Sequence, residues 1–365
     1  MKTATKVSAG LAISALTLFL FVRNLDAAKV AASLASASVP LLLVSIAIGY
    51  FGHLSLRAWR WGTMLAPLKE SVGFYDRFST TVIGYAISWL TPGRMGEVAR
   101  PILLARRQSL PVPGVLAIAA IERLLDAAAI VVLAATAALS APLWWREGAR
   151  SMIVEVPFAG RVELAGALSL LGAAALGATA AGAAVLRALV REDAAFLRWV
   201  TARSLAGGRG ARAWGAVRHL IEGASFLRSP RRALAVAGQS LLLWIVVALG
   251  SWIGLLAARV RIPFPGTLLL VVLTVLGFLV PTPGGTGTVH YAYQRGLIDL
   301  FGIEPNLASA ATFLYHPVSI YIPPILIGLI FAWRDGLSLS GARTIARNAD
   351  PPEASGRPGS ASTLA

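Results

Sequence analysis

Two short apolar segments, each closed by the same Pro-Gly motif, constrain the fold of this chain most strongly. Residues 78–90 run into Thr-Pro-Gly-Arg-Met-Gly at 91–96, and residues 267–280 run into Thr-Pro-Gly-Gly-Thr-Gly at 282–287. A 13-residue helix reaches only about 20 Å, whereas a bilayer core is roughly 30 Å thick. Short, broken apolar segments in corresponding positions of two halves are typical of transporter binding sites. We therefore expect two re-entrant broken helices, arranged as an inverted repeat.

The chain as a whole is too apolar for a soluble protein. It has 365 residues, of which 56% are hydrophobic and 14% are charged, and its mean hydropathy is +0.71. A soluble domain cannot bury this much apolar surface, so the fold class is expected to be an all-α polytopic membrane protein. Besides the two broken helices, six stretches are predicted to be full transmembrane helices: 7–22, 39–56, 113–139, 163–189, 233–257 and 306–333.

The domain organisation is expected to be simple. Residues 1–335 form the transmembrane domain, which includes a basic cytoplasmic interval at 187–232. Residues 336–365 are rich in Ser, Pro, Gly and Ala without periodicity, which predicts a disordered tail. The first apolar stretch also fits a cleaved signal peptide. We favour a retained anchor, because no small-x-small cleavage site follows at the right distance.

The net charge of +16 is explained by membrane topology. The basic residues fall between apolar stretches, where the positive-inside rule places them on the cytoplasmic side, so no nucleic-acid partner is expected. If the first broken segment enters and returns, the basic stretches 57–77 and 94–107 both stay inside. This arrangement puts both termini in the cytoplasm, predicts the bacterial inner membrane, and makes the second broken segment enter from outside. The chain has no cysteine and its histidines lack metal-ligand spacing, so no metal or cofactor is expected.

Charged residues within or beside apolar segments are the candidate substrate-binding residues. A charge in a bilayer costs a few kcal/mol and needs a partner or water. Glu122 and Asp126 are four residues apart and share one helix face. Backbone N–H groups of the helix that resumes after the first break also favour an anion. A cavity that receives a lipid phosphate is one reading, and a structural ion-pair network is the other. The candidates in this cluster are Arg94, Glu97, Arg100, Glu122, Arg123 and Asp126.

Three further groups complete the candidate site. His290, Tyr315 and His316 lie near the second motif and are expected to bind substrate. The hairpin backbones are assigned to Pro92, Gly93, Gly96, Pro281, Pro283, Gly284, Gly285 and Gly287. The cationic and aromatic group of Arg57, Arg60 and Trp61 is expected at the membrane interface, in contact with headgroups.

These motifs resemble those of the flippase-like integral membrane proteins related to the transmembrane region of lysylphosphatidylglycerol synthases. The resemblance covers nearly the whole chain to about residue 335. It implies that lipids or lipid-linked substrates are moved between leaflets, with re-entrant helices at the centre. It is carried by Arg57-x-x-Arg60-Trp61, Pro92-Gly93-Arg94-x-Gly96-Glu97-x-x-Arg100, Glu122-Arg123-x-x-Asp126 and Pro281-x-Pro283-Gly284-Gly285-x-Gly287.

Two departures from the family pattern concern histidines. Family members usually carry Glu where this chain has His290, and Arg where it has His316. Because both positions change together, we predict that they interact. Bifunctional members also carry a soluble aminoacyl-transferase domain after the membrane region. Only about 30 low-complexity residues follow here, so synthase activity is expected to be absent.

A lipid flippase or transporter, without covalent chemistry, is the leading functional hypothesis. Its substrate would be a phospholipid or a polyprenyl or other lipid-linked molecule, recognised by an anionic headgroup or lipid-linked phosphate. Two alternatives are a membrane-embedded transferase that acts on a lipid phosphate, and an accessory subunit of a lipid-pathway enzyme. The transferase would use Glu97, Glu122 or Asp126, but the sequence has no Asp-rich metal motif to support it.

Overall fold

The computed structural model describes residues 3–91, 94–144, 153–156, 160–189, 221–280 and 282–337, with a few positions between 198 and 219. Most of the basic interval and nearly all of the C-terminal tail therefore lie outside the described residues. The described chain is helical apart from one β-hairpin, in which β1 (Ile153–Val156) pairs antiparallel with β2 (Gly160–Glu163). β-Branched residues in both strands favour this local departure from helix.

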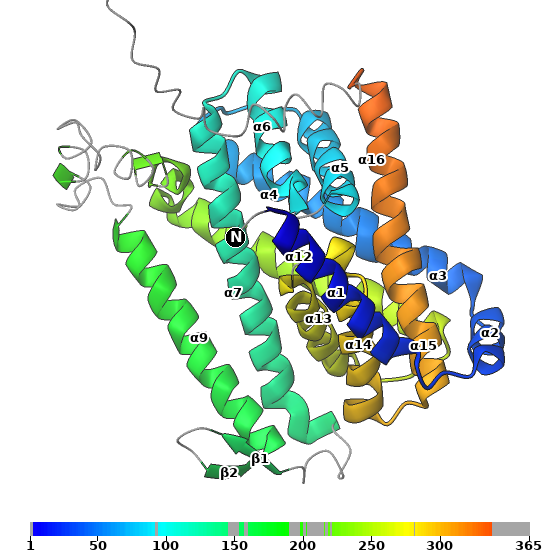
Figure 1. Cartoon of the computed structure of the whole chain (residues 1–365). Coiled ribbons are helices and arrows are strands. Elements are labelled where there is room, and N and C mark those ends of the chain that lie inside the picture. The colour runs from blue at the N-terminus through cyan, green and yellow to red at the C-terminus, as the bar shows by residue number, and fades with distance from the viewer. Residues whose placement is uncertain are drawn as a thin grey trace, which may run out of the picture.

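The helices pack into one bundle (Figure 1). In the first half they are α1 (Thr3–Val22), α2 (Ala27–Ala35), α3 (Val39–Ile46), the π-helix η1 (Ala47–Gly52), α4 (His53–Leu65), α5 (Phe74–Leu90), α6 (Gly96–Gln108), α7 (Val112–Trp144) and α9 (Leu164–Leu189). In the second half they are η3 (Ser225–Arg228), α12 (Pro230–Ala257), α13 (Phe264–Leu279), η4 (Pro283–Gly285), α14 (Thr288–Arg295), η5 (Gly296–Leu300), α15 (Pro305–Phe313), η6 (Leu314–Tyr321) and α16 (Ile322–Arg334).

A helix occupies each of the six stretches predicted to span the membrane. Within the described residues, three helical segments are long and apolar enough to cross it: Val39–Leu65, Pro230–Ala257 and Pro305–Arg334. A fourth is added if Ser8–Val22 and Ala27–Ala35, which meet at 84°, form one broken span. The total of six spans stays a prediction.

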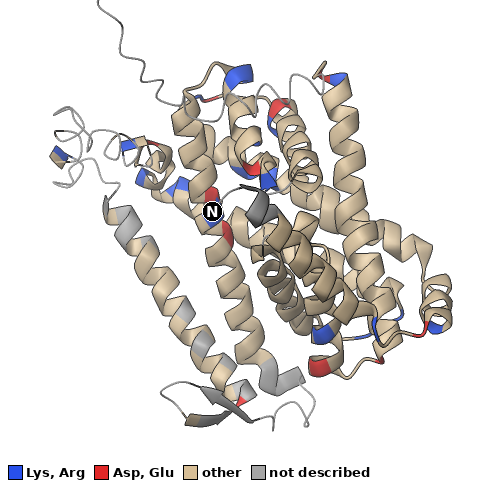
Figure 2. Ribbon diagram, viewed as in Figure 1, with Lys and Arg blue, Asp and Glu red and all other residues tan. Residues whose placement is uncertain are grey.

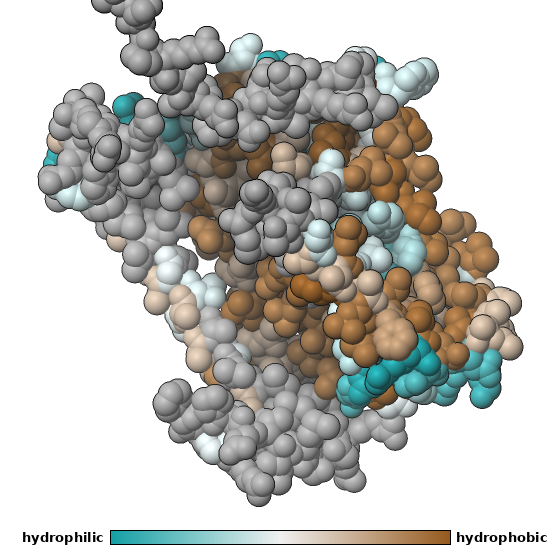
Figure 3. Space-filling model, in the orientation of Figure 1, coloured by the Kyte–Doolittle hydropathy of each residue, from teal (hydrophilic) through white to brown (hydrophobic). Residues whose placement is uncertain are grey.

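The surface of the bundle is suited to lipid. Large apolar side chains point outward on α1, α3 and α16, for example Leu16, Leu43 and Leu326, each more than half exposed. Figure 3 shows a broad apolar zone on this face of the molecule, bordered below by hydrophilic residues. Figure 2 shows charged residues at the two ends of the bundle and a separate group inside it, around α6 and α7. Outward apolar and inward polar groups are the arrangement that a bilayer requires.

The two broken segments fold into helical hairpins. α5 and α6 lie in the upper half of the bundle in Figure 1, and α13 and α14 lie in the lower half. Their tips touch, since the ring centroids of Trp89 on α5 and Phe278 on α13 are 5.5 Å apart. The broken segments therefore form helical hairpins whose tips are in contact, and their re-entry into the membrane stays a prediction.

Glycine permits the close packing of the first hairpin, so Gly96→Ala is expected to destabilise it. A Cβ at Gly96 would lie 1.7 Å from the carbonyl oxygen of Gly84, and backbone cannot move aside cheaply. We expect a loss of about 1–3 kcal/mol, the usual cost of overpacking, read as a lower melting temperature in detergent. Gly238→Ala on α12 is the matched control, because a Cβ there meets no atom within 4 Å. Equal melting temperatures for the two variants would contradict this packing.

Candidate functional site

Four helices bring a group of charged side chains together inside the bundle. α4 contributes Arg57 and Arg60, which lie four and seven residues after His53 and so share one face of the helix. The π-helix η1 directly precedes α4 in the chain, and π-helical turns are frequent at functional sites. The side chains of Arg57 and Arg60 are 2% and 0% exposed. Their charges therefore depend on partners within the protein.

Glu122 on α7 is the centre of this network. Its Oε1 accepts hydrogen bonds from Arg57 Nη1 at 2.7 Å and from Arg60 Nη2 at 2.8 Å. Its Oε2 accepts from Trp61 Nε1 at 2.8 Å and from Arg100 of the first hairpin. The carboxylate is completely buried and joins α4, α6 and α7 at one point.

Asp126 lies one turn further along α7 and extends the network. Its carboxylate pairs with Arg57 at 3.0 Å, with Arg60 at 2.8 Å and with Arg123 at 3.1 Å. Trp244 of α12 donates to the same carboxylate at 3.4 Å. Both acids of the Glu122-Arg123-x-x-Asp126 motif therefore face the same arginines.

The buried network, defined as Arg57, Arg60, Arg100, Glu122, Arg123 and Asp126, carries an excess of positive charge. Four guanidinium groups meet two carboxylates; three of the four are buried, and the Arg123 side chain is 39% exposed. The Nε atoms of Arg60 and Arg100 are buried and have no hydrogen-bond partner among the described residues. Uncompensated charge in a low-dielectric interior is costly, so the network favours a further anion or water beside it.

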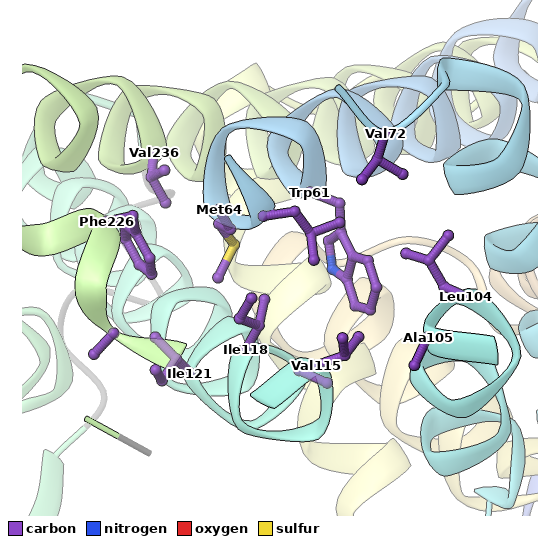
Figure 4. Close-up of a cluster of buried hydrophobic side chains, with 13 residues drawn as sticks. Trp61, Met64, Val72, Leu104, Ala105, Val115, Ile118, Ile121, Phe226 and Val236 are labelled. Carbon is purple, nitrogen blue, oxygen red and sulfur yellow. The ribbon is translucent and has the colours of Figure 1, made fainter. Parts of the chain in front are cut away.

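An apolar cluster adjoins the network and holds its helices in place. Figure 4 shows Leu104, Ala105 and Val115 near the Trp61 ring, and Phe226 on the far side of Met64 in the same cluster. Trp61 also donates to Glu122. The guanidinium of Arg100 lies 4.2 Å from the centre of the Trp61 ring, a cation–π contact. Trp61 thus contacts both the apolar cluster and the buried network.

The expected interfacial position of Arg57, Arg60 and Trp61 is wrong. All three are buried, because the helix does not end near Leu56 but continues through Leu65. The spacing from His53 to Arg57 and Arg60 was the available signal, since it places all three on one face of an apolar helix. Ser240 and Trp244, which also contact the network, were missed because nothing in their local sequence marks them.

Arg94 and Glu97 lie apart from the buried network. They pair with each other at 2.7 Å, with side chains 52% and 37% exposed, and Arg94 also lies over the Phe278 ring at 5.7 Å. Arg94 precedes the start of α6, whereas Arg100 lies in its second turn, about 6 Å of helix rise beyond Gly96. The sequence cluster therefore divides into a buried part and a part at the hairpin tip.

The hairpin junction, where the tips meet, contains both histidines. The rings of His290 and His316 are 4.5 Å apart, which confirms that the two positions interact. His316 Nε2 donates to the carbonyl of Gly284 at 3.1 Å. The rings of Trp89, Phe278 and Tyr321 surround His316, with centroids about 6 Å away.

The remaining candidates have different roles. Tyr315 points into another cluster, where it stacks on Tyr293 with centroids 4.2 Å apart, so it is not brought to the junction. The glycines of the second motif have φ angles of 58°, 68° and 87° at 284, 285 and 287, a conformation that other residues rarely adopt. Pro92, Gly93 and Pro281 lie outside the described residues. Within the described part of the chain, no group of three or more His, Cys, Asp or Glu residues is placed to hold a metal ion.

The apolar surface, the helical bundle and the buried charges define an α-helical integral membrane protein. Over residues 7–328 the sequence matches the family described as the lysylphosphatidylglycerol synthase TM region, and the chain belongs to that family. This membership places the protein among membrane proteins with a lipid-related function. No curated protein matches the chain.

Proposed function

We propose that this protein is a lipid flippase that moves a phosphate-bearing lipid between leaflets without covalent chemistry. The observation that carries the proposal is the positive excess of the buried network. Its two partnerless Nε atoms belong to Arg60 and Arg100, and a phosphate is the natural acceptor for guanidinium donors. Arg100 also belongs to α6 of the first hairpin, so a headgroup bound there contacts one of the two hairpins.

The placement of the hairpins supports a path across the membrane. In this proposal the first enters from the cytoplasm and the second from the outside of the bacterial inner membrane, with both termini cytoplasmic. The headgroup passes between the tips, while the acyl chains stay in lipid beside the apolar surface. Irregular backbone at membrane depth is tolerated where it lines such a cavity.

Arg100→Gln is expected to slow lipid exchange in proteoliposomes at least about tenfold, because a charged hydrogen bond is worth roughly 1.5–3 kcal/mol. Glu122 keeps Arg57, Arg60 and Trp61 as donors in this variant, so the protein should still fold. The measurement is the accessibility of an acyl-labelled fluorescent phosphatidylglycerol to a membrane-impermeant reductant.

The matched control is Arg295→Gln, which removes an exposed arginine paired with Asp299. It should exchange lipid at the rate of the unmodified protein. If folded Arg100→Gln protein also kept that rate, the network would be a structural ion-pair group. If the unmodified protein exchanged no lipid, the proposed function would be wrong.

A further inference from the structure

At the hairpin junction, two buried nitrogen atoms have no hydrogen-bond partner among the described residues. They are Nδ1 of His316, whose side chain is 1% exposed, and Nε1 of Trp89. The centroids of their rings are 6.0 Å apart. His316 lies on η6, and Trp89 lies near the end of α5. A buried polar atom without a partner usually marks a place where another molecule supplies one.

The two nitrogens have opposite hydrogen-bonding roles. His316 Nε2 contacts a carbonyl oxygen, which can only accept, so Nε2 carries the hydrogen. Among the described residues no carboxylate pairs with the ring, and an unpaired buried cation is costly, so the ring is neutral and Nδ1 is an acceptor. The indole Nε1 of Trp89 is a donor only. The junction therefore offers one donor and one acceptor.

These roles select the chemistry of a ligand. An ammonium group donates but cannot accept from Trp89, and a carboxylate or phosphate accepts but cannot donate to His316. A hydroxyl group does both. The face of Phe278 is already occupied by the Arg94 guanidinium, which further disfavours a cationic headgroup. The aromatic rings of Trp89, Phe278 and Tyr321 provide the apolar walls that such sites commonly have.

We infer that the hairpin junction is a headgroup subsite for an uncharged, hydroxyl-bearing group, such as a polyol or sugar attached to the lipid phosphate. The inference rests on the proposed function, in which the phosphate binds the buried network. Arg94 at the junction lies just before α6, and Arg100 in the network lies in the second turn of α6. The first hairpin therefore presents one arginine toward the proposed phosphate site and one toward the proposed hydroxyl site. Both nitrogens are buried in this conformation, so the inference requires that the tips separate before a headgroup reaches them.

The test compares lipids that share one phosphodiester charge and the same acyl chains. Phosphatidylinositol and phosphatidylglycerol carry hydroxyl groups, whereas phosphatidylethanol carries none. Binding to the purified full chain in detergent is measured by native mass spectrometry. We expect phosphatidylinositol to bind about tenfold more tightly than phosphatidylethanol, the effect of one or two hydrogen bonds to otherwise unpaired groups.

Trp89→Phe should lower the affinity for phosphatidylinositol to that for phosphatidylethanol. The affinity for phosphatidylethanol should not change. The indole N–H of Trp89 donates to no described residue, so its removal breaks no hydrogen bond among them. The smaller ring loses part of the packing against Phe278 and Tyr321, and the melting temperature measures that loss separately from binding. Trp252→Phe is the matched control, because that indole donates to the carbonyl of Ile262, remote from the junction. It should keep the preference.

Three outcomes separate the subsite from the proposed function. An unmodified protein without a preference for hydroxylated lipids would overturn the subsite, and so would a preference that persists in both Trp89→Phe and His316→Phe. A preference that these variants abolish, in a protein that exchanges no lipid in liposomes, would support the subsite and overturn the flippase proposal.

Discussion

Glu122→Gln is expected to abolish lipid exchange and to lower the stability of the protein by about 3–5 kcal/mol, the cost of breaking a buried ion pair. The Glu122 carboxylate accepts from Arg57, Arg60, Trp61 and Arg100, so its neutralisation leaves three buried guanidinium groups less compensated. Asp126, which pairs with Arg57, Arg60 and Arg123, is then the one carboxylate left in the network. The measurements are the yield of monodisperse protein, its melting temperature in detergent, and exchange in proteoliposomes.

The control for this prediction is Glu222→Gln. Glu222 also pairs with an arginine, Arg218, but both side chains are more than 40% exposed, and such a surface pair contributes 1 kcal/mol or less. This variant should resemble the unmodified protein in all three measurements. If the Glu122→Gln protein folded and exchanged lipid normally, Glu122 would be required neither for stability nor for lipid exchange.

Replacement of His290 and His316 by a charged pair is expected to show that the effects of the two substitutions depend strongly on each other. His316→Arg alone places a guanidinium beside a neutral His290 ring, in a site where the described residues offer it no carboxylate, and should reduce folded yield and lipid exchange severely. The double variant His290→Glu/His316→Arg restores the charge pattern usual in the family. Because the two rings are 4.5 Å apart, the new groups can pair, and we expect recovery of both readouts.

The size of the coupling decides the interpretation. Groups in one buried network commonly couple by about 0.5–3 kcal/mol in a double-mutant cycle, so the double variant should be clearly better than the sum of the two single changes. His219→Arg is the control, since His219 lies at an exposed position of the basic interval and pairs with Glu222. Additive losses would show that the histidines serve packing alone. The unpaired nitrogen of His316 would then still require the separate binding test.

The sequence alone determined the features that depend on local pattern. Apolar length and composition predicted a helical membrane protein, and the paired motifs at 91–96 and 282–287 predicted two hairpins whose tips meet. The shared change to histidine at 290 and 316 predicted their contact. These predictions were possible because helix breaks, membrane length and glycine turns are governed by neighbouring residues.

Only the tertiary structure decided which charges share a site. Arg57 and Arg60 are more than 60 residues from Glu122, and their local pattern fits a membrane interface equally well until the helix is seen to continue to Leu65. Conversely, Arg94 and Glu97 are close in sequence to Arg100 but pair with each other at the tip, whereas Arg100 pairs with Glu122 of α7. Pairing between charges is set by the packing of α4, α6, α7 and α12, and packing across long sequence separations leaves no local pattern to read.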